Sequence, residues 1–81
     1  MNPIIENHVL PLVGSVHMGE FDQSQPWHTV TLQTKFCKHI RERNVLKLTL
    51  YLAFCIQEWP DIDACPLDRD MIKDAVKIIG G

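Results

Sequence analysis

The side chains best suited to chemistry in this sequence are three cysteines and four histidines. Structural zinc takes four such ligands, usually delivered as closely spaced pairs such as Cys-x-x-Cys. The only near pair is Cys37 and His39, and on a helix of 3.6 residues per turn their side chains would point about 160° apart. We therefore expect no metal site and no cofactor. The odd number of cysteines argues against a disulfide framework and favours free thiols in a cytoplasmic protein.

No catalytic motif is recognisable either. Residues 61–66 begin like a calcium-binding loop, but the sequence has Cys65, Pro66 and Ile72 where an EF-hand needs a third oxygen ligand, a Gly and a Glu. Cys37 has histidines nearby as bases, but no orienting group is indicated, and 81 residues leave little room for a pocket. No Gly-rich phosphate loop is present. We predict that the protein is not an enzyme.

A basic cluster is the clearest candidate for a binding function. Residues 1–34 contain no Lys or Arg, and five then follow closely: Lys35, Lys38, Arg41, Arg43 and Lys47. Such a cluster is one requirement of a nucleic-acid surface. Against that, Glu42 interrupts the cluster and the net charge of the chain is −2, so an acidic protein surface is an alternative, and a solvated face with local ion pairs another. The candidate partner-binding residues in this region are Lys35, Lys38, His39, Arg41 and Arg43.

The first 27 residues supply a second candidate. They hold many apolar side chains between Pro and Gly residues, and they include Phe21 and Trp27. Aromatic side chains are enriched in the cores of protein interfaces, so we add Phe21 and Trp27 to the candidate partner-binding residues. The alternative is that this apolar arm folds over the helices of the same chain.

The elements that must position these residues follow from the apolar pattern. Pro and Gly interrupt residues 1–26 too often for a useful helix, so we expect an extended arm, with a short hairpin of 9–13 and 15–18 as one option. Residues 28–36 alternate like a strand, but a helix explains more of 27–43. Its apolar arc would hold Val30, Leu32, Phe36, Cys37 and Ile40, and its polar side His28, Thr31, Lys35, Lys38, His39 and Glu42.

Two further helices are predicted. Residues 45–58 are apolar almost all the way round, which indicates a central helix, and Asn44 and Pro60 mark its ends. Residues 67–79 are strongly amphipathic and run into Gly80. We predict a mainly α, single domain over 1–81, with an extended arm at 1–26 and a three-helix core at 27–79. The alternative is an α+β fold with a hairpin and a strand at 28–36.

The function expected from these features is binding. The apolar stretch 45–59 is shorter than the about 20 residues that a bilayer span needs, so we expect no membrane association. The central helix needs cover on nearly all sides, which the arm or a second copy in a homodimer would supply. We expect a small protein-interaction module that binds and modulates a larger protein as an adaptor or inhibitor. The alternative is a nucleic-acid-binding protein that uses residues 35–47.

Overall fold

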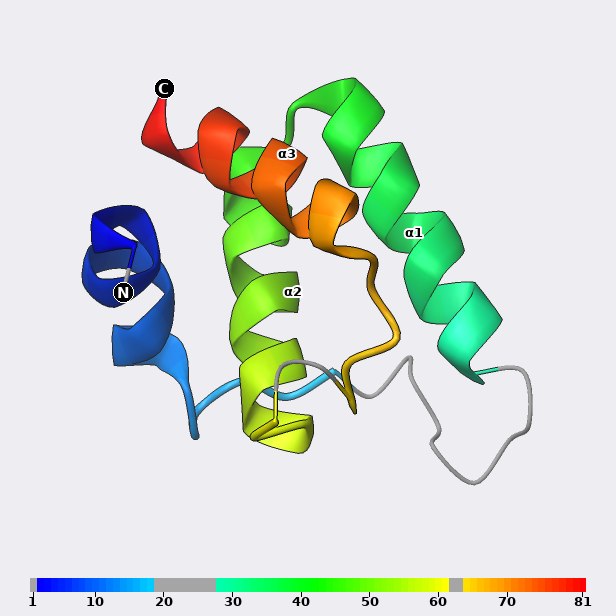
Figure 1. The fold of residues 1–81 in the computed structure, drawn as a ribbon, viewed down its shortest axis with the longest axis horizontal. Helices are drawn as coiled ribbons and strands as arrows, with labels where there is room; N and C mark the ends of the chain where they lie inside the picture. The colour runs from blue at the N-terminus through cyan, green and yellow to red at the C-terminus, as the bar shows by residue number, and fades with distance from the viewer. Residues whose placement is uncertain (1, 19–27, 62–63) are drawn as a thin grey trace.

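Three α-helices and a helical N-terminal segment form the fold. The computed structural model describes residues 2–18, 28–61 and 64–81 (Figure 1). The helices are α1 (His28–Glu42), α2 (Val45–Glu58) and α3 (Arg69–Gly80), preceded by a π-helical turn η1 (Ile5–Val9) and a 3₁₀ turn η2 (Leu10–Leu12). No strand occurs in the described ranges, so the mainly α prediction is confirmed and the α+β alternative, with its strand at 28–36, is wrong.

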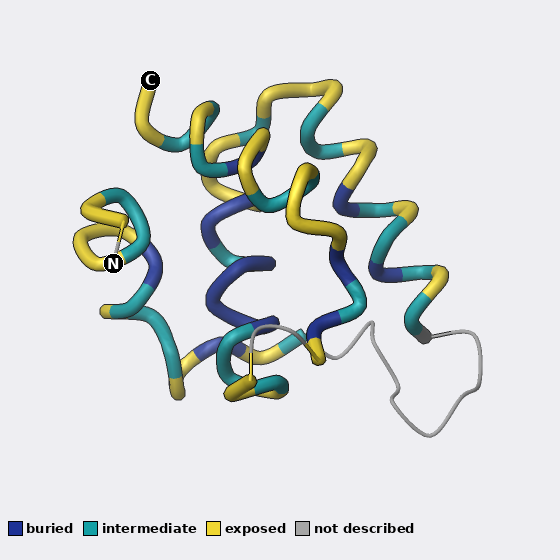
Figure 2. Tube along the Cα trace, in the orientation of Figure 1, coloured by how far each residue is buried: buried dark blue, intermediate teal, exposed yellow. Residues whose placement is uncertain are grey.

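The core lies around α2. Nearly every side chain from Leu48 to Cys55 is buried, and α2 runs between α1 and the N-terminal segment while α3 crosses it (Figures 1 and 2). Leu32 and Phe36, four positions apart on α1, face this core, and the Phe36 ring lies 6.3 Å from the Tyr51 ring. The predicted central helix is therefore observed, with the bounds that the sequence suggested.

The turn between α1 and α2 has well-defined ends. The backbone N–H of Arg43 donates to the carbonyl of Ile40, and that of Asn44 donates to the carbonyl of His39. These two bonds are the pattern of a Schellman motif, in which the residue after the helix takes a left-handed conformation. That residue is Arg43, with φ at 51°. The Asn44 side chain then accepts from the Lys47 N–H at 3.2 Å and caps α2.

The expectation of an extended arm and hairpin is wrong for residues 3–12, which are helical. Pro3 stands at the first helical position and Pro11 in the first turn of η2, where proline removes no required hydrogen bond. The prolines that we took as helix breakers therefore begin short helices. Val9 is fully buried against the core, so these turns pack on α2 as part of the domain.

Gln57 of α2 forms hydrogen bonds with the chain that follows these turns. Its side-chain oxygen accepts from the N–H of Gly14 at 2.9 Å and of Val16 at 3.4 Å, and its amide donates to the Val16 carbonyl at 3.1 Å. At the other end, Ile4 approaches Gly80 of α3 so closely that a Cβ there would lie 3.0 Å from the Ile4 Cδ1. The N-terminal segment thus covers the side of α2 for which a second copy was considered.

None of the helices within the described part of the chain has the length and apolar character needed to cross a bilayer.

Candidate functional site

Exposed basic and apolar side chains lie together around the α1–α2 turn. We define the turn surface as Arg41, Arg43, Val45, Leu46 and Lys47, all of them exposed. Val45 and Leu46 leave 46% and 67% of their surface accessible, although they begin a helix whose middle is buried. Apolar side chains flanked by cations are the arrangement that would suit an apolar contact surrounded by carboxylates.

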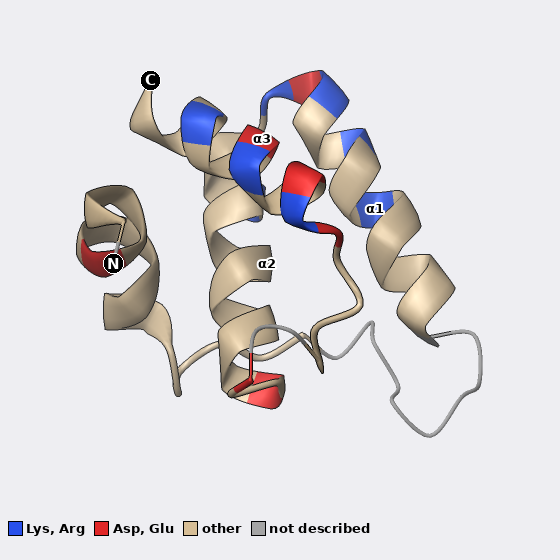
Figure 3. Cartoon of the chain, in the orientation of Figure 1, with Lys and Arg blue, Asp and Glu red and all other residues tan. Residues whose placement is uncertain are grey.

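A cavity of about 290 Å³ adjoins the turn surface between α1 and α3. Arg41 and Arg43 line it together with Asp74 and Lys77 of α3, and apolar side chains form the rest of its wall. Among the described residues of this wall, the cations therefore outnumber the carboxylates. Figure 3 shows basic residues on both helices at this end of the molecule.

The predicted basic residues do not all lie at the turn surface. Lys38 is exposed, but its ammonium lies 3.9 Å from the Glu42 carboxylate, an exposed pair four residues apart that stabilises the helix only slightly. Lys35 is half-buried. The structure therefore brings Arg41 and Arg43 together at one cavity and leaves Lys38 and Lys35 on earlier turns of α1.

His39 does not occupy the solvent-facing position that the helical pattern predicted. Its ring meets the Tyr51 ring edge-on, with centroids 5.0 Å apart and an interplanar angle of 86°. This places His39 against α2, in the boundary between the two helices. Tyr51 itself, in α2, is almost fully buried. The other predicted partner-binding residues, Phe21 and Trp27, lie outside the described residues.

The apolar arc of α1 is narrower than its pattern suggested. Val30 is 62% exposed and Cys37 is exposed, whereas Leu32 and Phe36 are buried and Ile40 is half-buried. The reason is that, among the described residues, one stripe of α1 is buried against the rest of the domain. Cys37 faces an open groove of about 430 Å³ between α1 and α3.

A second constellation was not anticipated from the sequence. The thiol of Cys55, in α2, is hydrogen-bonded to that of Cys65, in the segment that leads to α3. Both thiols are free and buried. Residues ten positions apart lie about 15 Å apart along a helix and farther apart along a strand, so only the return of the chain after α2 could bring them together.

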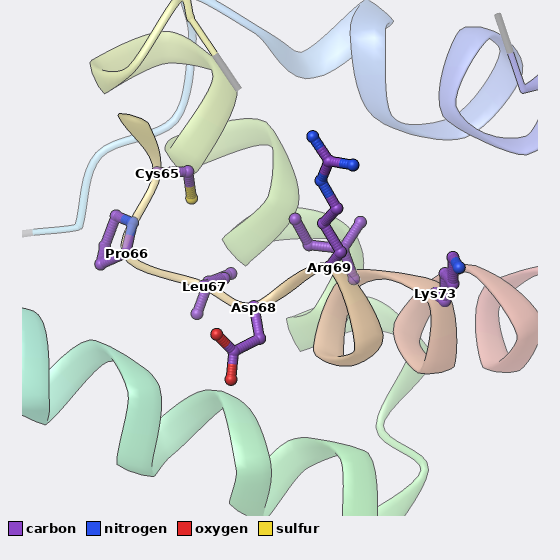
Figure 4. A pocket seen from close by; sticks show the side chains of 7 residues that line it. Cys65, Pro66, Leu67, Asp68, Arg69 and Lys73 are labelled. Atoms are coloured by element: carbon purple, nitrogen blue, oxygen red, sulfur yellow. The ribbon is translucent and has the colours of Figure 1, made fainter. Parts of the chain in front are cut away.

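Cys65 also borders a cavity of about 460 Å³ (Figure 4). The lining residues are Cys65, Pro66, Leu67, Asp68, Arg69, Ile72 and Lys73. In this view the Arg69 side chain extends away from the chain on the side where Cys65 lies, and the Asp68 carboxylate is turned towards α1. The described lining therefore combines one thiol with two basic side chains and one carboxylate.

Within the described ranges, no three His, Cys, Asp or Glu side chains gather as a metal ion would require. Comparison of the chain with models of known protein families, with curated proteins and with solved structures gives no match.

Proposed function

We propose that this protein is a small non-enzymatic interaction module that binds a larger protein through the turn surface and modulates it as an adaptor or inhibitor. The observation that carries the proposal is the exposure of Val45 and Leu46 beside Arg41 and Arg43. Burial of the surface these two apolar side chains still expose would contribute about 2 kcal/mol. That corresponds to roughly a thirtyfold gain in affinity.

The backbone conformation of Arg43 is a second observation in favour of the turn surface as the binding site. A non-glycine residue in the left-handed region costs about 1–2 kcal/mol, and such strain is found preferentially at functional sites. Glycine is the usual residue at this position of a Schellman motif. An arginine here is explained if its side chain makes a contact that glycine cannot.

The chemistry of the partner follows from the charges. The guanidinium groups of Arg41 and Arg43 recognise carboxylates in a bidentate manner, so the partner surface should be apolar at its centre and acidic around it. Nucleic acid is the alternative partner, but Val45 and Leu46 would then remain exposed, and Glu42 and Asp74 would oppose phosphate nearby.

We extend the proposal to a cytoplasmic location, which the three free cysteines favour because reducing compartments keep thiols unpaired. A second copy of the chain is a further partner to be tested. The N-terminal segment already covers the side of α2 that suggested it, so a homodimer would have to use the turn surface itself.

The test is affinity capture from a lysate of the native cells, with the wild-type chain, Leu46→Asp and Val30→Asp. The two replaced side chains are matched, because both lie in the first turn of a helix and expose about the same fraction of their surface, 67% and 62%. Aspartate in a first turn is favoured by the helix dipole, so neither change should unfold the chain. Circular dichroism checks this before capture.

A protein retained at high salt by the wild type and by Val30→Asp, but lost with Leu46→Asp, is the expected result. If both variants fail to retain the protein, or if both retain it, the turn surface is refuted as the binding site. Recovery of nucleic acid at low salt only, abolished by Lys38→Ala with Arg41→Ala, would replace the proposal with the alternative. Capture of a second copy of this chain would show that the partner is the chain itself, in a homodimer.

A further inference from the structure

The cavity between α1 and α3 carries an inference that rests on the proposed function and extends the binding site onto a third helix. Arg41, at the end of α1, and Arg43, in the turn after it, line this cavity on one side, and Lys77 of α3 lines it on the other. All three side chains are exposed. Segments far apart in the sequence therefore bring three cations to one cavity of about 290 Å³ at the edge of the turn surface.

These three cations are not neutralised by ion pairs within the chain. Among the described residues, no ion pair involves Arg41, Arg43 or Lys77, and Asp74 in the same wall forms none either. Three cations against one carboxylate leave the described wall with an excess of two positive charges. Cations gathered around one hollow raise its positive potential, so the cavity attracts an anion.

The apolar part of the wall indicates the shape of that anion. Ile40 of α1 and Ile78 of α3 are half-buried side chains that pack against the core and also line the cavity. A charge held partly against apolar surface is screened by salt less than a charge in open water. The cavity therefore suits a side chain with a short apolar stem and a negative tip.

We propose that this cavity binds the carboxylate of a glutamate or aspartate side chain of the partner, while an apolar residue next to it in the partner packs on Val45 and Leu46. Guanidinium groups hold a carboxylate in a bidentate manner, and Lys77 adds a compact positive charge. A phosphorylated side chain fits less well, because Asp74 in the wall would repel its second negative charge.

The experiment titrates the isotope-labelled full chain with two capped tetrapeptides, LEEL and LQQL, and follows the backbone amide signals by NMR. The peptides differ only in the charge of their two central residues. LEEL should shift the signals around Arg41, Arg43 and Lys77 in a saturable way, and LQQL should bind about two- to fivefold more weakly. Added salt should weaken the binding of LEEL and leave that of LQQL nearly unchanged.

Two variants with opposite expected effects locate the carboxylate. Lys77→Gln should weaken the binding of LEEL by about two- to fourfold, the effect of one exposed charge, and leave that of LQQL unchanged. Asp74→Asn should strengthen the binding of LEEL by about the same factor, because the wall loses its opposing charge. Lys73→Gln and Asp70→Asn are the matched controls, because both residues are exposed on the same helix and lie outside the described lining of this cavity.

Equal affinity for LEEL and LQQL, or no saturable shift around the cavity with either peptide, would overturn the proposal. Equal effects of the control variants would also overturn it. So would tighter binding of a peptide with phosphoserine in place of one glutamate, which would identify a phosphate site instead.

Leu46→Ala separates this inference from the proposed function, because it removes apolar surface and changes no charge. If Leu46→Ala weakens the binding of both peptides, while Lys77→Gln and Asp74→Asn have no effect, the cavity is refuted and the turn surface stands. If the two charge variants act as expected and Leu46→Ala has no effect, the carboxylate site stands and the apolar centre of the turn surface is refuted.

Discussion

Replacement of Arg43 by glycine should make the folded chain more stable while it removes a side chain from the turn surface. Arg43 follows α1 in a left-handed conformation, with φ at 51°, and its N–H and that of Asn44 complete a Schellman motif. Because its carbonyl and Cβ crowd each other there, the residue costs about 1–2 kcal/mol. Glycine has no Cβ, so the Arg43→Gly chain keeps both hydrogen bonds without that cost.

The size of the effect follows from two opposing contributions. Relief of the left-handed backbone contributes about 1–2 kcal/mol, and the greater freedom of glycine in the unfolded chain removes about 0.5–1 kcal/mol. The net gain in the free energy of unfolding then lies between about 0 and about 1.5 kcal/mol, with a central value of about 0.75 kcal/mol. For a chain of this size a gain near the central value raises Tm by roughly 2–8 °C.

Arg43→Ala is the matched control, because alanine removes the same side chain but keeps the Cβ. We expect its Tm to stay within a few degrees of the wild type, and we expect both variants to lose affinity for the captured partner. Thermal unfolding followed by circular dichroism compares the three chains. An Arg43→Gly chain no more stable than Arg43→Ala would refute the argument from backbone strain, and unchanged partner binding would remove the functional reason for it.

Two further predictions concern the core. Gln57→Ala removes three hydrogen bonds to Gly14 and Val16 and should lower the free energy of unfolding by about 1–3 kcal/mol. Amide hydrogen exchange should become faster in the N-terminal segment and change little in α1. An equal increase in exchange throughout the chain would contradict a local role for Gln57. In the Cys37→Ser background, alkylation of Cys65 by iodoacetamide should rise with pH around a midpoint near 7, and Cys55→Ala should move that midpoint upward. Because the folded-state pKa of Cys65 lies below its ordinary value of 9, its ionisation adds stability as pH rises from about 7 to 9, and the raised pKa of Cys55 opposes this above 9. A midpoint unaffected by the loss of Cys55 would contradict the thiol–thiol hydrogen bond.

The three long helices were predictable because local signals and the apolar pattern agree. Asn44 and Pro60 bracket α2, and a run of apolar residues lies between them. The N-terminal segment was not predictable in the same way. Pro3 and Pro11 interrupt a long helix but are well suited to the start of a short one, and only the contacts with α2 decide between the two.

The candidate sites were likewise predictable only where a local pattern determines them. The exposure of Lys38, Arg41 and Arg43 follows from their positions on and after α1. The position of His39 could not be foreseen, because its ring packs on Tyr51, a contact between two helices. The thiol pair depends entirely on how the chain returns from α2 to α3, which no local pattern specifies.

The N-terminal segment also has a consequence for the rates at which the chain folds and unfolds. Its contacts join Ile4 to Gly80 and residues 14–16 to Gln57, so the surface that receives it forms only after α2 and α3 have met. Contacts between such distant parts of a chain are expected to form after the folding barrier. Gln57→Ala should therefore accelerate unfolding and leave the folding rate nearly unchanged in stopped-flow measurements, and a slower folding rate would show that the segment belongs to the nucleus. On this reasoning the segment determines how long the folded protein persists, while the three helices determine how quickly it forms.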